Sequence, residues 1–116
     1  MTDKKGNEKV SDELIAVCAV NAARRTEGVA EMAGGFSDMI NRGLGREIVA
    51  KGVKVSRPED EEIEVDVFII AKYGCQIPIV AWDIQENVKK EIQYMTGEEV
   101  QAVNIHVQGV KADDEN

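Results

Sequence analysis

Alternating polar and apolar residues in the second half of the chain predict strands. Residues 62–67 (EIEVDV) and 103–108 (VNIHVQ) alternate with a period of two, which is typical of strands with one buried face. The apolar residues between them recur at every third or fourth position, as on one face of a helix: Ile77, Ala81, Ile84, Val88, Ile92 and Met95. We therefore expect a strand, a helix beginning near Pro78 and ending at Thr96-Gly97, and a second strand.

The first half of the chain predicts a buried helix followed by strands. Ser11 is a suitable N-cap, residues 14–23 are almost entirely apolar, and Gly28 is a suitable stop. Strands are expected at residues 29–33 and 52–57, on either side of a glycine-rich connection. The resulting order, α-β-β-β-α-β, predicts an α+β fold in which both helices pack on one face of a small mixed sheet.

A turn at residues 58–60 predicts that the strands on either side of it form an antiparallel hairpin. If the turn is centred there, Val55 faces Ile63 and Val53 faces Val65.

Length and charge restrict the classes of protein to consider. At 116 residues the chain fits one domain, which we place at residues 10–110, with disordered polar tails at residues 1–9 and 111–116. No apolar run reaches the roughly 20 residues of a membrane span, and the N-terminus does not resemble a signal peptide, so we expect a cytoplasmic protein without direct membrane insertion. A net charge of -8 disfavours nucleic acid as a ligand. Cys18 and Cys75, both in apolar surroundings, are interpreted as reduced and buried.

Several segments spread over residues 10–110 together resemble the alkaline shock protein family, the envelope stress response proteins of Gram-positive bacteria. Their order and spacing carry the resemblance: Gly45-Arg46-Glu47, residues 51–55, residues 65–67, Tyr73-Gly74, Ile77-Pro78, Met95-Thr96-Gly97 and residues 103–109. The resemblance implies a small cytoplasmic, non-enzymatic protein in envelope homeostasis and alkaline or general stress. It also implies assemblies near the membrane, recruited by a membrane-anchored partner. This chain departs from the family pattern at Glu47, where a basic residue is common, and at Trp82, where we expect a polar one.

The chain offers few residues for catalysis or for metal binding. His106 is its one histidine, which excludes a histidine-rich metal site, and its position predicts a surface residue beside Asn104 and Gln108. Cys75 and His106 form a conceivable nucleophile and base, although the sequence does not place them together. The glycine-rich segment lacks the Gly-Lys-Ser/Thr element of a phosphate loop. We predict no catalytic, cofactor-binding or metal-binding residues.

Six residues are predicted to contact partner proteins. Phe68 and Ile70 fall on the outer sheet face, Ile79 and Trp82 lie outside the apolar stripe of the second helix, and Arg42 and Arg46 lie in the glycine-rich loop. The alternative is that the tails or the loop cover the four apolar side chains.

The charges of the predicted hairpin are separated into two blocks. Residues 42–57 hold five basic residues and one acid, a net of +4, and residues 59–66 hold six acids and no base. Either the two arms neutralise each other, or the loop arginines reach the acidic strands of a neighbouring molecule head to tail.

These patterns favour an interaction module that forms homo-oligomers or binds a small membrane-anchored protein. The alternative is a small RNA-binding α+β domain, suggested by the mixed topology and the basic loop. The acidic outer face argues against it, because single-stranded RNA requires aromatic platforms and basic groups.

Overall fold

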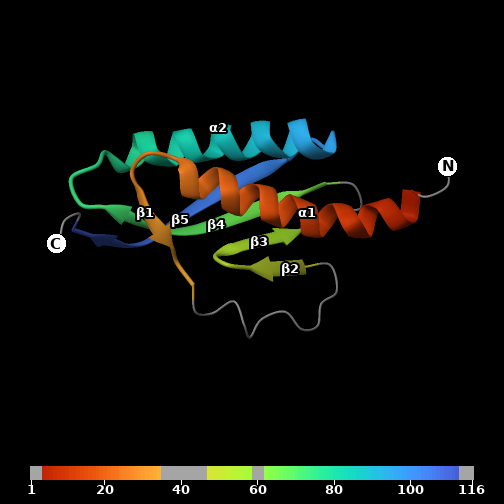
Figure 1. The fold of residues 1–116 in the computed structure, drawn as a ribbon, viewed down its shortest axis with the longest axis horizontal. Helices are drawn as coiled ribbons and strands as arrows, with labels where there is room; N and C mark the ends of the chain where they lie inside the picture. Colours follow the sequence, from red (N-terminus) through yellow and green to blue (C-terminus); the bar gives the residue numbers. More distant parts are fainter. Residues whose placement is uncertain (1–3, 35–46, 59–61, 113–116) are drawn as a thin grey trace.

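The computed structural model describes residues 4–34, 47–58 and 62–112, which form two helices and five strands (Figure 1). In chain order these are α1 (Lys4–Arg25), β1 (Val29–Met32), β2 (Glu47–Ala50), β3 (Val53–Ser56), β4 (Glu64–Lys72), α2 (Ile77–Thr96) and β5 (Ala102–Lys111). The predicted α+β class is confirmed.

Strand β4 is the centre of the sheet. Along one edge, its first half pairs with β3 and its second half with β1, both antiparallel, and β2 extends the sheet beyond β3. Along the other edge, β5 runs parallel to the whole of β4. The parallel pair follows from the helical crossover through α2, so the sheet is mixed, as predicted.

Both helices cover one face of this sheet (Figure 1). Every second residue of β4, namely Val65, Val67, Ile69 and Ala71, is buried beneath them. Burying each such valine or isoleucine stabilises the fold by roughly 1.5–3 kcal/mol. The opposite face of β4 therefore presents its alternate residues to the outside.

The structure differs from the prediction near both ends of the chain and in one additional strand. Helix α1 begins at Lys4, so Ser11 is not its N-cap and most of the predicted N-terminal tail is helical. Strand β2 was not predicted, because its four residues follow a glycine-rich stretch and form a run too short for a clear period. Strand β5 continues to Lys111, one position beyond the predicted domain.

The hairpin of β3 and β4 has a different register from the predicted one. Val55 pairs with Val65 and Val53 with Val67, so the predicted partners are wrong by two residues. The connection from residue 57 to residue 63 is longer than a tight turn, which moves the register along β4. Side chains still face the predicted sides, because a shift of two residues preserves the face.

The apolar stripe of α2 is confirmed at its centre and differs at its ends. Ile84, Val88 and Ile92 are buried as predicted, but Val80 takes the buried place expected for Ala81. The predicted stripe residues Ile77 and Met95 are exposed, at 37% and 50%, since they lie at the two ends of the helix. Gly97 ends α2 in the left-handed conformation, as Thr96-Gly97 predicted.

Candidate functional site

The outer face of the sheet carries Phe68 and Ile70, as the alternation predicted. Both side chains are half-buried and alternate with the buried residues of β4. The Phe68 ring stacks on the His106 ring of β5, with centroids 4.3 Å apart and planes inclined by 12°. Phe68 therefore already has an intramolecular neighbour, and its exposed part is a flat aromatic surface shared with His106.

His106 is more than the plain surface residue that was expected. Its Nε2 lies 2.9 Å from Asp66 Oδ1, and Asn104 Nδ2 donates to the same oxygen at 3.2 Å. The register explains this group, because Phe68 lies opposite His106 and Asp66 lies opposite Asn104. These contacts join β4 to β5 on the outer face. Cys75 lies in the turn beyond the end of β4, so the strand register separates it from His106.

Helix α2 exposes Ile79 and Trp82, as predicted, with exposed fractions of 53% and 60%. On one flank of the helix, Asn87 Nδ2 donates to Thr26 Oγ1 just beyond the end of α1, at 2.9 Å. On another, Gln85 Nε2 donates to the Val103 carbonyl of β5 at 3.0 Å. Trp82 lies one turn before Gln85, so it projects on the side of α2 that faces away from α1.

More apolar side chains are exposed than the sequence indicated. Tyr73 and Tyr94 are exposed, Tyr94 at 84%, and so are Val107 and Val110. Val107 and Val110 lie opposite Ile69 and Ala71 of β4, hence on the helix side of β5. We call the exposed apolar residues of the first turns of α2 and the second half of β5 the α2–β5 patch: Ile77, Ile79, Trp82, Val107 and Val110. Alternation alone predicts Val107 as buried, because it does not show where α2 stops covering the strand.

Of the basic block at residues 42–57, the structure describes only the part from residue 47 onward. Arg42 and Arg46 lie outside the described residues. Arg57 donates through Nε and Nη2 to Asp12 Oδ1 of α1, at 2.9 and 2.7 Å, with both side chains largely buried. Arg57 is thus paired with the helix. Lys54 lies directly opposite Asp66 of β4, which agrees with partial neutralisation between the hairpin arms.

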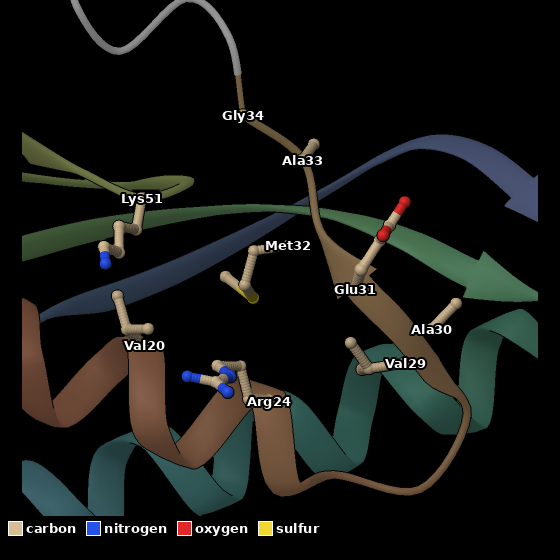
Figure 2. A pocket seen from close by; sticks show the side chains of 9 residues that line it. All are labelled: Val20, Arg24, Val29, Ala30, Glu31, Met32, Ala33, Gly34 and Lys51. Atoms are coloured by element: carbon tan, nitrogen blue, oxygen red, sulfur yellow. The ribbon is translucent and has the colours of Figure 1, made fainter.

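A cavity of about 520 Å³ opens between α1, β1 and the turn that joins β2 to β3 (Figure 2). The residues that line it are Val20, Arg24, Val29, Ala30, Glu31, Met32, Ala33, Gly34 and Lys51. Sequence reasoning missed it, because the cavity is assembled from three segments that lie far apart along the chain.

The two cysteines lie in different environments. Cys18 is 2% exposed, and burial, helped by the negative charge of Glu91, raises the pKa of its thiol. Cys75 is half-buried, so the prediction that both thiols are buried is wrong for Cys75. Over residues 4–34, 47–58 and 62–112, no three His, Cys, Asp or Glu side chains gather closely enough to hold a metal ion.

Comparison with known families decides where this fold belongs. A family described as having a cell envelope-related function matches residues 1–112, nearly the whole chain. The chain is a member of the alkaline shock protein 23 family. The resemblance drawn from the scattered segments is confirmed.

Relatives of this alkaline shock protein 23 family member come from Gram-positive bacteria. The Bacillus subtilis protein YloU is 38% identical over 110 residues, covering 93% of this chain and 91% of YloU. YqhY of the same organism is 36% identical over 108 residues, covering 93% of this chain and 79% of YqhY. A Streptococcus pyogenes protein described as a stress response regulator gls24 homolog is 27% identical, covering 92% of this chain and 60% of that protein. The description of the family connects this chain with the cell envelope, and the gls24 homolog is the relative that is described as a stress response regulator.

Among solved structures, MamM CTD aligns with a TM-score of 0.49 at 14% identity, over 84% of this chain and 93% of that one. Within the part of this family member that the structure describes, neither helix is both long and apolar enough to cross a bilayer.

Proposed function

We propose that this protein is a non-catalytic interaction module of the envelope stress response, acting through contacts with other copies of itself or with a membrane-anchored protein. The observation that carries the proposal is the exposure of Ile79 and Trp82, which are 53% and 60% exposed in the first turns of α2. Tryptophan is strongly enriched among the residues that dominate binding energy, because its large ring gains much from leaving water.

The neighbouring strand supports a contact at the same place. Strand β5 pairs with β4 and with no other described strand, so one of its edges is open to the outside. In a parallel pair, every second residue directs both its N–H and its C=O toward the neighbouring strand. Gln101 is one such residue, because its N–H donates to the Ile63 carbonyl. By the same alternation, the backbone groups of Asn104 and His106 point to the open edge. An extended segment of a partner would find hydrogen bonds there and apolar contact on the α2–β5 patch.

The outer face of the sheet provides a second candidate contact surface, which is aromatic and bordered by a negative charge. Phe68 and His106 form an aromatic surface next to Ile70, bordered by the carboxylate of Asp66. Two distinct surfaces on one molecule allow contacts that extend from copy to copy, since a head-to-tail contact that does not close produces chains.

Light scattering after size-exclusion chromatography tests the proposal. We expect the wild type to form oligomers at micromolar concentrations, and Trp82→Ala and Phe68→Asp to reduce their fraction. Tyr94→Ala is the matched control, because Tyr94 is also an exposed aromatic residue of α2 but lies outside the α2–β5 patch. Circular dichroism of each variant checks that the fold is intact.

Two results would count against the proposal. One is a monodisperse wild-type monomer that also fails to retain a membrane protein from native cell membranes. The other is an equal effect of Tyr94→Ala and Trp82→Ala.

A further inference from the structure

Two cationic side chains, Arg24 of α1 and Lys51 of the β2–β3 turn, line the cavity between α1, β1 and that turn. Figure 2 shows the Arg24 guanidinium and the Lys51 ammonium directed into the same part of the cavity, near Val20 and Met32. Neither forms an ion pair with another described residue. Because like charges that share a space repel each other, this arrangement favours the arrival of an anion.

The one acidic residue of the lining does not supply that anion. The Glu31 carboxylate points away from the cavity (Figure 2) and lies 3.6 Å from Lys111 Nζ of β5. The register agrees, since Glu31 pairs with Ile70, whose side chain is on the outer face of the sheet. The interior of the cavity is therefore positive.

Apolar side chains form the part of the cavity wall beside these charges. Val20 of α1 and Val29 of β1 are each 7% exposed and belong to the core, and the half-buried Met32 packs against this core. A volume of about 520 Å³ lies within the range of small-molecule sites. An inorganic anion leaves the exposed part of Met32 and the edges of the two valines uncovered, whereas a short hydrocarbon chain covers them.

The backbone at Lys51 provides an independent observation. Lys51 has φ 43°, and among the described residues it is the one non-glycine with positive φ. It occupies the first position of a two-residue hairpin turn, followed by Gly52 at φ 86°, where Asn, Asp or Gly is the usual residue. A strained residue that is kept in place is a reason to suspect function.

The turn is also held firmly at the cavity mouth. A Cβ at Gly52 would lie 2.7 Å from the Ala33 carbonyl oxygen, so the turn packs closely against the end of β1. This packing fixes the position from which the Lys51 side chain reaches over the cavity.

We infer that this cavity binds a small amphipathic anion. A carboxylate or phosphate headgroup lies between Arg24 and Lys51, with the guanidinium donating two parallel hydrogen bonds, and a short hydrocarbon chain lies on Val20, Val29 and Met32. Both a free alkyl acid and the headgroup end of an anionic lipid have this chemistry.

Calorimetric titration of the full chain at low salt tests the inference with four probes: octyl phosphate, octanoate, octanol and inorganic phosphate. We expect the two amphipathic anions to bind at least about tenfold more tightly than octanol or phosphate. Octanol lacks the anionic headgroup, and inorganic phosphate lacks the hydrocarbon chain. Amide NMR shifts should concentrate at Val20, Met32 and Lys51. Equal binding of phosphate or of octanol, or shifts elsewhere, would overturn the inference.

Vesicles distinguish the two sources of the anion. Co-sedimentation with phosphatidylglycerol vesicles but not with phosphatidylcholine vesicles assigns a lipid headgroup. Binding of octyl phosphate without any co-sedimentation assigns a free alkyl acid or phosphate.

Variants locate the site and separate it from general charge effects. Lys51→Asn and Arg24→Gln should each weaken octyl phosphate binding about tenfold, the usual loss for one charge-assisted hydrogen bond. Lys51→Asn should also raise the thermal midpoint, since Asn adopts positive φ more readily than Lys does. Lys89→Gln removes the same charge from an exposed position of α2 and should change neither quantity. Unchanged affinity in folded Lys51→Asn, or an equal loss in Lys89→Gln, contradicts the inference.

Discussion

At the scale of single residues, the two thiols show how burial controls reactivity. Cys18 lies on the buried side of α1, and both burial and the charge of Glu91 disfavour its thiolate, which raises its pKa. Cys75 is half-buried in the turn between β4 and α2. Since the thiolate is the nucleophile and must also be reached by a reagent, the two residues should react at very different rates.

Titration with a chromogenic disulfide reagent near neutral pH checks this expectation. One thiol should react quickly in the native protein and the second only after denaturant is added. Cys75→Ser should abolish the fast phase, and Cys18→Ser should remove the slow one. Two equally fast native thiols would show that Cys18 is accessible.

At the scale of elements, the junction of α1 and β1 determines how the two helices meet. Thr26 is buried just after the end of α1. Its Oγ1 donates to the Ala22 carbonyl and accepts from Asn87 Nδ2 of α2, both at 2.9 Å. Gly28 follows at φ 99°, and a Cβ there would lie 2.4 Å from Val80 Cγ2. The chain therefore turns into β1 directly against α2, where only glycine fits.

Gly28→Ala should accordingly lower the free energy of unfolding by about 3 kcal/mol, combining left-handed strain with a clash in the core. Urea unfolding followed by circular dichroism measures it. Gly74→Ala is the control, since Gly74 has a similar φ of 92° but no atom within 4 Å of the added Cβ. The control should lose only the backbone contribution, about 1–2 kcal/mol. Equal losses would mean that Val80 moves aside at little cost.

At the scale of the whole molecule, net charge opposes self-association. Each copy carries -8, so two copies repel each other unless the surfaces that meet are apolar or oppositely charged. Copies can meet either through the apolar α2–β5 patch or through the opposite charge blocks of the hairpin. Raising the salt concentration should strengthen the first kind of contact and weaken the second.

If copies meet through the α2–β5 patch, oligomers should increase as salt rises from about 0.02 to about 0.3 M, because screening weakens the repulsion between acidic molecules. Light scattering across this range measures the change, and Trp82→Ala should remove most of it. A decrease with salt would instead indicate contacts between the basic loop region and the acidic residues of a neighbour.

Predictions from the sequence were correct where a feature depends on residues close together along the chain, and they failed where it depends on segments far apart. The buried faces of β4 and of the centre of α2 were predicted correctly, because a period along the chain determines which residues share one side of an element. The predicted β3–β4 register was wrong by two residues, because the register depends on the length of the connecting loop. Ile79 and Trp82 were recognised as exposed from their positions on the helix, but Val107 and Val110 were not, since their exposure depends on where α2 begins over β5.

The amino-acid sequence by itself determined the fold class, the order of most elements, the family and the faces of the long strand and the second helix, because local periodicity and residue type carry that information. Tertiary structure alone decided the partners of His106, the pairing of Arg57 with Asp12 and the convergence of Arg24 and Lys51 on one cavity. Each of these brings together residues from separate segments. Their proximity depends on strand register, helix placement and turn geometry, and a local sequence pattern determines none of these.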